Sequence, residues 1–364
     1  MSIDALFEPF TVRGLTLSNR FVMSAMSYYK NHGGTPNAAF VEYHRERAAG
    51  GVGLSTTGGT AIDRPSANNH PNLANIRPET ADAWRAVVDA VHAEGGPIAI
   101  QLWHAGGLFN VAPDWSPAPL ESPSGFAAPD VVVGEPMTDD AIVNCVDAYR
   151  RAAELAIEIG FDAVEIHGAH GFLIDQFFWG GTNRRGDRWG GRSIRDRTAF
   201  ATEVVRAVRA VVGDDTPLLM KVSQWKEQDY GAKLARTPAE LVDWLGPLRD
   251  AGVDVFHCSQ RRFWEPEFDG SELNLAGWVK QEIGAPTVTI GSVGLSNDVM
   301  SFFGGDVAER RPLDELVRRF DRGEFDLVGI ARSILADPDW VAKVRAGELD
   351  RLPPVDAATL DLGI

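Results

Sequence analysis

Eight short apolar runs recur along the chain and predict eight buried β-strands. Each run is apolar nearly throughout and does not alternate with polar positions, which is typical of strands covered on both faces in a parallel sheet. The runs occupy residues 20–26, 51–57, 97–102, 161–166, 217–223, 253–258, 286–291 and 325–330.

Amphipathic segments lie between these runs and predict helices. Residues 138–159 repeat apolar side chains at helical spacing, and Thr138 stands where an N-cap belongs. Strands that alternate with helices predict an α/β fold, a single (β/α)8 TIM barrel formed by residues 1–364 as one domain. The alternative, a doubly wound open sheet, is less favoured because no G-x-G-x-x-G turn follows the first strand. Similar helical patterns cover 78–94, 194–212 and 237–251, and glycines stand at or just past three predicted C-termini, at Gly160, Gly213 and Gly252.

Two segments fall outside the strand–helix repeat. The stretch "FTVRGLTLSNR" predicts a hairpin that turns at Arg13-Gly14, and we expect it to close the bottom of the barrel. Residues 103–137 are rich in Pro, Gly and Ser and too long for a plain connection. Because they follow the third strand, we expect an extended loop over the face that carries the active site.

Composition and charge narrow the classes of partner. The formal net charge of -16 repels phosphate backbones and anionic lipids, so we expect no nucleic-acid partner and no membrane partner. Two cysteines, Cys145 and Cys258, are too few for a disulfide framework and suit a reducing compartment. The first residues lack the pattern of a signal peptide, and no apolar run is long enough to span a membrane, so we expect a cytoplasmic protein.

Candidate chemistry gathers where the predicted strands end, which is the catalytic face of barrel enzymes. Small residues and tyrosines follow the first strand, so the backbone there could approach a flat ligand that the tyrosines line. Gln101 can both donate and accept hydrogen bonds. Lys221 brings a positive charge to apolar surroundings, where it should face an anion or an electron-rich ring, or else pair with a carboxylate. The residues after the first and second strands are Ser24, Ala25, Met26, Ser27, Tyr28, Tyr29, Gly58 and Gly59.

The last two strands end in a pattern that favours a phosphate site. Loops after strands seven and eight are the usual phosphate-binding place in this fold. Gly291, Ser292 and Gly294 offer backbone N–H groups, and Arg332 begins a short helix after Ala331. The alternative is that the glycines only turn the chain and that Arg332 pairs with a surface acid.

Two histidines follow the fourth strand, in "EIHGAHGFLIDQFF". His167 and His170 could bind a metal, but no third ligand is nearby and the surrounding glycines favour a turn over a helix, so we expect no metal. They could also be core histidines with satisfied hydrogen bonds. The favoured interpretation is two N–H donors that hold one substrate oxygen. The neighbouring Glu165 is expected to point away from this pair.

Taken in order, several segments resemble the Old Yellow Enzyme family of FMN-dependent ene reductases over nearly the whole chain. They are "LFEPFTVRGLTLSNRFVMSAM", "QLWHAG", "EIHGAHGFLIDQFF", "TNRRGDRWGG", "GSVG" and "GIARSILADPDW". The resemblance implies non-covalent FMN, NADH or NADPH as reductant, an activated alkene as small-molecule substrate, and a homo-oligomer. It assigns the substrate oxygen to His167 and His170. It assigns the flavin ring to Ser24, Ala25, Met26, Ser27, Gly59, Gln101 and Lys221, and the phosphate to Gly291, Ser292, Ala331 and Arg332.

Three positions depart from the pattern of that family. Phe172 stands where the family places a tyrosine that gives a proton to the substrate, and phenylalanine cannot donate. Tyr28 and Tyr29 are candidates for that role. Ser27 replaces a cysteine that is frequent in the bacterial branch, and Lys221 replaces the common arginine, which keeps the charge but loses the bidentate fork.

Phe172 therefore leaves two redox functions open. One is reduction of activated alkenes with a different proton donor. The other is a flavin-dependent dehydrogenase or quinone-type reductase that does not protonate carbon. A remote alternative is a non-redox barrel lyase or hydrolase acting on a phosphorylated substrate, which would need paired carboxylates or a metal at the strand ends, where the sequence shows only Glu165.

Overall fold

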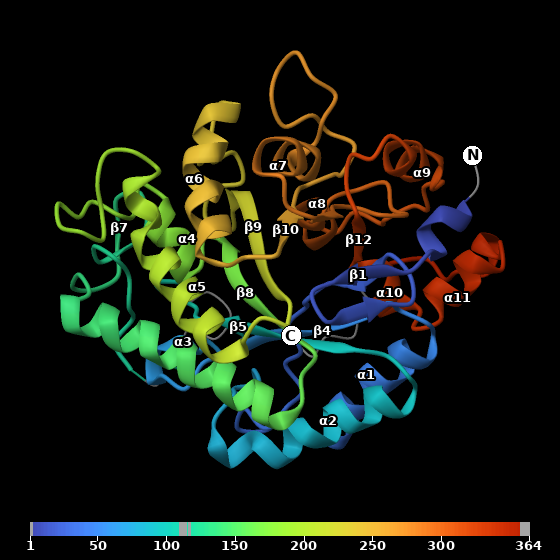
Figure 1. The fold of residues 1–364 in the computed structure, drawn as a ribbon, viewed down its shortest axis with the longest axis horizontal. Coiled ribbons are helices and arrows are strands. Elements are labelled where there is room, and N and C mark those ends of the chain that lie inside the picture. The colour runs from blue at the N-terminus through green and yellow to red at the C-terminus, as the bar shows by residue number, and fades with distance from the viewer. Residues whose placement is uncertain (1–2, 109–114, 116–117, 357–364) are drawn as a thin grey trace.

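Eight parallel strands close into a barrel in the computed structural model, which describes residues 3–108, 115 and 118–356. This confirms the predicted (β/α)8 architecture, and Figure 1 shows the helices arranged around the strands. Strands β4, β8 and β9 run several residues beyond the apolar runs that predicted them. The strands are β3 (Phe21–Met23), β4 (Leu54–Ala61), β5 (Ile98–Trp103), β8 (Ala163–His170), β9 (Leu218–Lys226), β10 (Val255–Ser259), β11 (Thr287–Ile290) and β12 (Leu327–Ile330).

The predicted helices form with the capping that the sequence suggested. The hydroxyl of Thr138 accepts a hydrogen bond from the N–H of Ala141, and Gly160 ends the same helix with a left-handed φ of 110°. Two predicted helices begin later than expected, after short 3-10 turns at Pro78–Thr80 and Asp196–Thr198. The helices are α1 (Ala38–Ala49), α2 (Ala81–Ala93), α3 (Asp139–Ile159), α4 (Leu173–Phe178), α5 (Ala199–Val212), α6 (Pro238–Ala251), α7 (Leu275–Ile283), α8 (Val299–Phe303), α9 (Asp314–Asp321), α10 (Arg332–Ala336) and α11 (Trp340–Arg345).

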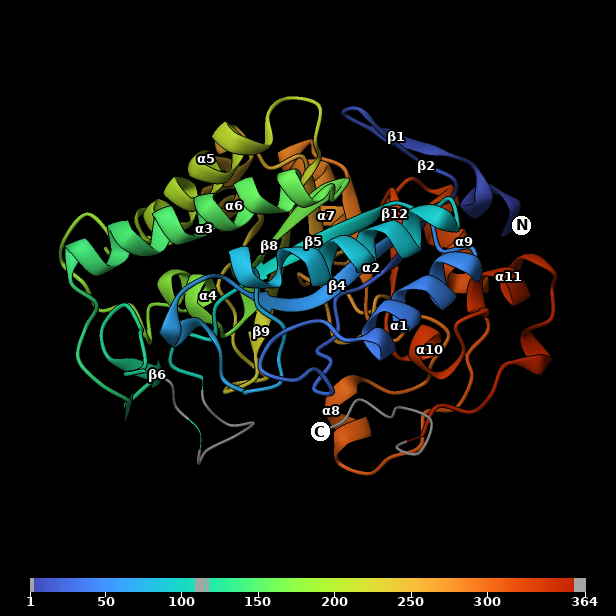
Figure 2. The ribbon, with the colours of Figure 1, turned by 90° about the horizontal axis from the view of Figure 1, so that it is seen from below.

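The N-terminal hairpin closes the bottom of the barrel, as predicted. Strands β1 (Phe10–Val12) and β2 (Leu15–Leu17) pair antiparallel around Arg13, and Figure 2 shows them at the opposite end of the barrel from β6 and α8. Their apolar side chains pack on a layer to which each barrel strand contributes one residue. That layer consists of Val22, Leu54, Ala99, Ala163, Leu219, Val255, Val288 and Leu327.

The long connection after β5 forms a second small hairpin. Strands β6 (Phe126–Ala128) and β7 (Val131–Val132) pair antiparallel, while residues 109–114 and 116–117 of the predicted loop lie outside the described residues. The side-chain amide of Gln228, just past β9, donates to the carbonyls of Ala127 and Gly171. The hairpin therefore lies at the C-terminal ends of the strands, beside the histidine segment.

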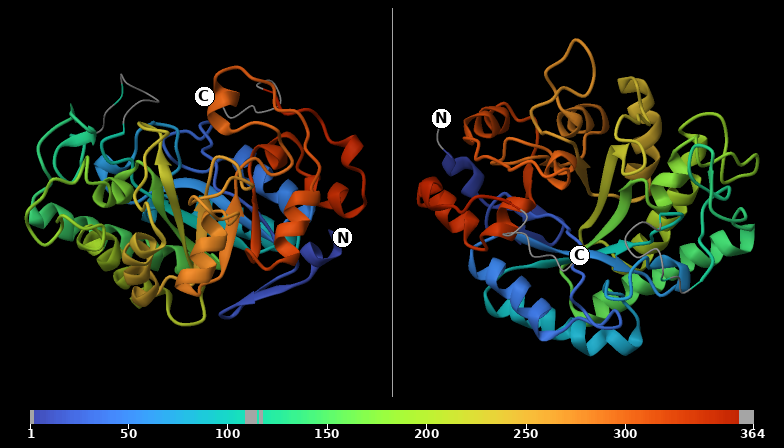
Figure 3. Two further views of the ribbon diagram at one scale, coloured as in Figure 1. Left: turned by 90° about the horizontal axis from the view of Figure 1, so that it is seen from above. Right: turned by 180° about the vertical axis from the view of Figure 1, so that it is seen from behind.

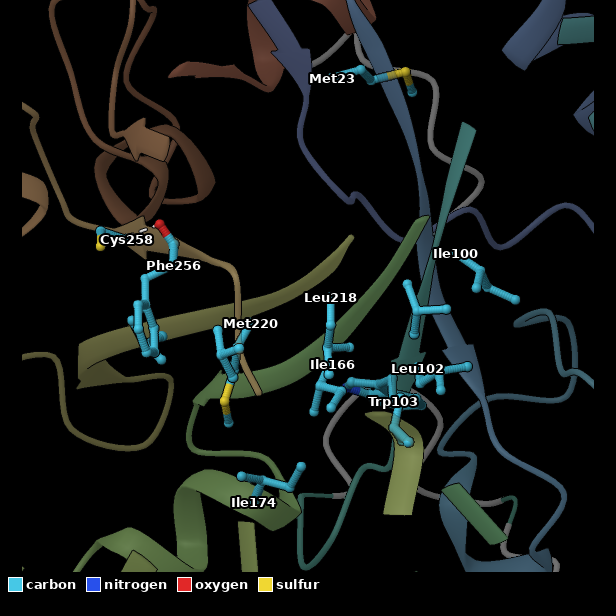
Figure 4. Packing of buried hydrophobic residues seen from close by; sticks show 14 of the residues in the cluster. Met23, Ile100, Leu102, Trp103, Ile166, Ile174, Leu218, Met220, Phe256 and Cys258 are labelled. Carbon is cyan, nitrogen blue, oxygen red and sulfur yellow. Dashed lines mark hydrogen bonds between the residues drawn. The ribbon is translucent and has the colours of Figure 1, made fainter. Parts of the chain in front are cut away.

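The main core lies between the barrel and its helices. Alternate strand residues such as Ile100, Ile166, Met220 and Phe256 are fully buried there (Figure 4). Because strand side chains alternate, the intervening residues face the barrel interior. Figure 3 (left) shows the N-terminal hairpin, in blue, at the lower end of the barrel. Within the described residues, no helix combines the length and the apolarity needed to cross a membrane.

Candidate functional site

A cavity opens at the C-terminal ends of the strands and collects most of the predicted site residues. Nine of its lining residues come from the predicted set, and three others, Asn69, Trp103 and Glu227, join them. The nine are Ala25, Ser27, Tyr29, Gly59, Gln101, His167, His170, Phe172 and Lys221.

A buried polar layer lies directly above the apolar bottom of the barrel. Each of its members stands two residues after a member of the apolar layer on the same strand, so both side chains point inward. This spacing corrects the expectation for Glu165: it stands two residues before His167 and shares its inward face. The layer contains Ser24 on β3, Gln101 on β5, Glu165 on β8, Lys221 on β9 and His257 on β10, each less than 5% exposed.

Hydrogen bonds join the members of this layer into one network. The Nζ of Lys221 donates to the Oγ of Ser24 over 3.0 Å, and that hydroxyl also meets the Nε2 of His257 at 3.0 Å. The Nδ1 of His257 lies 2.7 Å from one oxygen of Glu165, and the Nε2 of Gln101 donates to the other oxygen over 2.6 Å. Lys221 and Gln101 also line the cavity, so the network ends at its floor.

The charges of the network follow from burial and from its internal contacts. Burial by itself would raise the pKa of Glu165, but His257, Lys221 and Gln101 outweigh that effect and lower the pKa to about 2. Burial lowers the pKa of Lys221, and the carboxylate of Glu165 partly opposes that change. Burial also lowers the pKa of His257. At neutral pH the layer therefore holds an ionised carboxylate and a neutral imidazole, with Lys221 beside them.

The two predicted histidines lie on β8 itself and not in a turn after the strand. The alternation of β8 is interrupted by a bulge between Gly168 and His170, and His170 adopts a left-handed φ of 62°. The hydroxyl of Ser223 accepts a hydrogen bond from the backbone N–H of His170 and so helps to hold this unusual conformation. The bulge brings the two imidazoles together, with ring centres 5.2 Å apart.

Both imidazoles are neutral in this environment. Burial lowers the pKa of His167 to about 3 and the pKa of His170 well below its usual value. The backbone N–H of Ala169 donates to the Nδ1 of His167, which leaves the proton of that ring on Nε2. The Nε2 of His170 meets the hydroxyl of Ser259 at 2.8 Å. Each ring thus has one nitrogen anchored by the protein.

Aromatic contacts fix the walls around the histidines. Trp225 stacks on His170, with ring centres 4.2 Å apart. The ring of Phe172 packs edge-on against Trp103 and His167, at 5.1 Å from each. Phe172 thus lines the cavity without offering a polar atom.

Three of the predicted residues that follow the first strand lie outside the cavity wall, and Ser24 is the one that belongs to the polar layer. Tyr28 turns into the core, where its ring contacts Phe40 and Tyr43, so it does not share the site of Tyr29. Met26 is half-buried against the hydrophobic core. The physical reason is that the segment after β3 continues without regular alternation, so neighbouring residues diverge.

The predicted phosphate residues meet at the ends of β11 and β12. Gly291 has a φ of 145°, and a Cβ there would lie 2.6 Å from the carbonyl oxygen of Gln260, so only glycine fits. Arg332 is 8% exposed and donates to the side chain and the carbonyl of Asn297, not to a surface acid. Burial lowers the pKa of Arg332 to about 10, which still leaves it charged at neutral pH. Ala331, at the N-cap of α10, completes this group.

Three functional candidates escaped the sequence analysis, and one of them had a readable signal. His257 could have been found because it stands two residues after Val255, as Lys221 stands two after Leu219. Asn69 and Glu227 come from connecting segments whose course only the folded chain shows. Within the described ranges, no group of three or more His, Cys, Asp or Glu side chains could hold a metal ion.

Comparison with known proteins gives one consistent family. The family described as "NADH:flavin oxidoreductase / NADH oxidase" matches residues 5–350. The chain is 38% identical over 357 residues to 12-oxophytodienoate reductase 7 of Oryza sativa subsp. japonica, covering 93% of this chain and 87% of the relative. It is 30% identical over 361 residues to the NADPH dehydrogenase of Clostridium acetobutylicum, covering 97% and 99%. Its structure is similar to that of morphinone reductase in complex with tetrahydroNAD, with a TM-score of 0.79 and 27% identity over 98% of this chain and 94% of the other.

Proposed function

The chain belongs to the NADH:flavin oxidoreductase / NADH oxidase family, the family of Old Yellow Enzyme, and on this premise we propose that it reduces the C=C bond of α,β-unsaturated carbonyl compounds and similarly activated acceptors. It is a flavin oxidoreductase that uses FMN and takes its electrons from NADH or NADPH. When bound, FMN carries hydride from the nicotinamide to the acceptor. The observation that supports the proposal is the convergence of Lys221, His167, His170 and Tyr29 on one cavity.

The residues of the cavity fit FMN. Lys221 is buried and has a neutral hydroxyl as its hydrogen-bond partner, so its Nζ can offer further N–H groups to the pyrimidine edge of the ring. Gln101 directs its Nε2 to Glu165, so its carbonyl oxygen is available to accept from a ring N–H. Small residues at Ala25 and Gly59 leave room for the flat ring. Ser24, Ser27 and Met26 complete the segment that we assign to it.

The phosphate would be held at the ends of β11 and β12. Arg332 donates to neutral oxygen atoms of Asn297, and among the described residues no carboxylate forms an ion pair with it. A buried guanidinium of this kind binds a phosphate strongly, because both partners are charged and water is excluded. The backbone N–H groups of Gly291 and Ser292, together with Ala331, would surround the same group.

The histidine pair would hold the oxygen of the acceptor. The Nε2–H of His167 can donate one hydrogen bond. His170 can donate a second from Nδ1 if the hydroxyl of Ser259 donates to its Nε2. Both rings are neutral, so they stabilise the charge that develops on the oxygen by hydrogen bonding and not by releasing protons.

Tyr29 is the proton donor that we assign in place of Phe172. Burial raises the pKa of Tyr29, so its hydroxyl keeps its proton at neutral pH and can deliver it from the cavity wall. Its ring packs edge-on against His70, with centres 4.8 Å apart, which fixes the position of the phenol. Tyr28 does not compete for this role because it lies in the core.

A second function is favoured by one observation, the phenylalanine at position 172. If Tyr29 does not reach the carbon that needs a proton, the chain would act as a flavin-dependent dehydrogenase or a quinone-type reductase, because neither reaction protonates carbon. The non-redox lyase or hydrolase is inconsistent with membership of this family.

The deciding experiment follows the flavin through one cycle. The purified protein should show bound flavin in its visible spectrum and lose that absorption on anaerobic addition of NADH or NADPH. Reoxidation by 2-cyclohexenone, with cyclohexanone as the product, would support alkene reduction. If a quinone reoxidises the flavin and the enone does not, the second function replaces the first.

A further inference from the structure

Glu165 lies at the centre of the polar layer without touching the cavity. The side chains of Glu165 and His257 are both 0% exposed, and each carboxylate oxygen of Glu165 accepts one hydrogen bond. Isolated buried carboxylates are strongly disfavoured, so a fully buried carboxylate needs compensating partners. Its partners are Gln101 and His257, and Gln101 reaches the floor of the cavity.

The charge of Lys221 depends on its surroundings, whereas the charge of an arginine at this position would not. A lysine loses its proton readily when buried, whereas a guanidinium stays charged. The titratable groups near Lys221 are Glu165, His167 and His170 on β8, His257 on β10, and Tyr29 and Glu227, which line the same cavity. Of these groups, Glu165 is the one whose carboxylate opposes the effect of burial on the pKa of Lys221.

We infer that Glu165 is a positioning residue that keeps Lys221 protonated at the floor of the cavity and fixes the orientation of Gln101. The inference rests on the proposed assignment of Lys221 and Gln101 to the flavin ring. Its consequence is that the cavity floor presents a cation and a carbonyl acceptor to the ring when reduction places negative charge on it.

The direction of each hydrogen bond follows from the ionised carboxylate. An ionised carboxylate only accepts, so His257 must carry its proton on Nδ1 and Gln101 must turn its amide nitrogen toward Glu165. The Nε2 of His257 then accepts from the hydroxyl of Ser24, and the oxygen of Ser24 accepts from Lys221. One acid thereby orders the polar side chains of four other strands.

The packing around His257 leaves room for its hydrogen bond to Ser24. A Cβ at Gly329 on β12 would lie 3.1 Å from the Nε2 of His257 and 2.9 Å from the Cβ of Ile290. The glycine therefore leaves the space in which the imidazole reaches Ser24. A larger residue would push His257 away from this hydrogen bond.

The test compares Glu165→Gln in two backgrounds, the natural chain and Lys221→Arg. The measurement is the reduction potential of bound FMN as a function of pH, taken from absorbance with a reference dye. In the arginine background, removal of the negative charge should raise the potential at every pH, because the guanidinium does not titrate. In the lysine background, the potential should rise only at low pH and fall below that of the parent where Lys221 loses its proton.

A matched control separates this effect from the loss of any buried acid. Glu324 is 6% exposed and paired with Arg319 beside α9, outside the barrel interior. Glu324→Gln should leave the potential and its pH dependence unchanged, and circular dichroism should show that each variant is folded. An equal shift in both backgrounds for Glu165→Gln would overturn the inference.

A measurement without FMN distinguishes failure of this inference from failure of the proposed function. In ¹⁵N-histidine NMR of the protein without FMN, His257 should show a neutral ring protonated at Nδ1, and Glu165→Gln should change that signal. A ring protonated at Nε2 in the natural chain would refute the hydrogen-bond directions above. A natural chain that fails to bind FMN would instead refute the proposed function.

Discussion

The buried ion pair between Asp175 and Lys226 offers a direct test of what holds the histidine segment in place. The Nζ of Lys226, at the end of β9, lies 2.8 Å from Asp175 on α4, and both side chains are 0% exposed. The second oxygen of Asp175 accepts from the backbone N–H of Gly171, in the turn between His170 and Phe172. The perturbations are Asp175→Asn, Lys226→Met and the double variant.

The magnitude follows from the geometry of the pair. Two unit charges 2.8 Å apart attract each other by about 6 kcal/mol at an effective dielectric constant of 20. Desolvation of both ions offsets much of this attraction, but removal of one partner leaves the other buried and unpaired, which costs about 3–5 kcal/mol. We therefore expect each single variant to lose about 3–5 kcal/mol of unfolding free energy. The double variant should lose less than their sum, with a coupling of about 2–3 kcal/mol.

Urea denaturation at pH 7.5, followed by circular dichroism and tryptophan fluorescence, measures the three losses. Repetition at pH 5 adds a second check. Burial raises the pKa of Asp175 to about 6, so at pH 5 the folded carboxyl binds a proton and the coupling should shrink. Single variants that lose less than about 1 kcal/mol, or a double variant that loses the full sum, would refute the assignment of a paired buried charge.

Three further predictions concern separate parts of the molecule. Tyr29→Phe should slow reoxidation of the flavin by an enone by about 10²–10⁴-fold and leave reoxidation by a quinone unchanged. The core variant Tyr28→Phe should affect neither rate. Equal enone rates for Tyr29→Phe and the natural chain would exclude Tyr29 as the proton donor. Arg332→Gln should weaken FMN binding by about 10- to 100-fold in fluorescence titrations but leave riboflavin binding unchanged. An equal loss of affinity for FMN and for riboflavin would contradict a contact between Arg332 and the phosphate. Burial lowers the pKa of His44 to about 3 in the folded chain. As the pH falls from about 6.5 to 3, the imidazole binds a proton in the unfolded chain but not in the folded one, so the folded state loses stability over that window. His44→Gln should make unfolding less dependent on pH over that window, by up to about 5 kcal/mol in acid denaturation, and an unchanged slope would refute this role.

The amino-acid sequence determined the architecture because its signals are local and repeat eight times. Continuous apolar runs, amphipathic segments and caps such as Thr138 and Gly160 each specify an element without reference to distant residues. The hairpin at Arg13 was predictable for the same reason. The residues that the family resemblance assigned to the ligand site also mostly converge on one cavity.

Tertiary structure decided which of those residues share a surface. Tyr28 and Tyr29 are neighbours in the sequence, yet one packs in the core and the other lines the cavity, because the backbone between β3 and α1 follows no regular period. The bulge in β8 likewise changes the direction of His170, which strict alternation would have placed on the other face from His167.

The buried polar layer shows both contributions together. Strand alternation places Glu165, Lys221 and His257 inside the barrel, and that much is readable from spacing alone. Their mutual contacts depend on the stagger of five strands around a closed sheet, since residues 197 positions apart, Ser24 and Lys221, hydrogen-bond across the interior. Sequence spacing thus determined which side chains point inward, while barrel closure decided which of them meet and what charge each one carries.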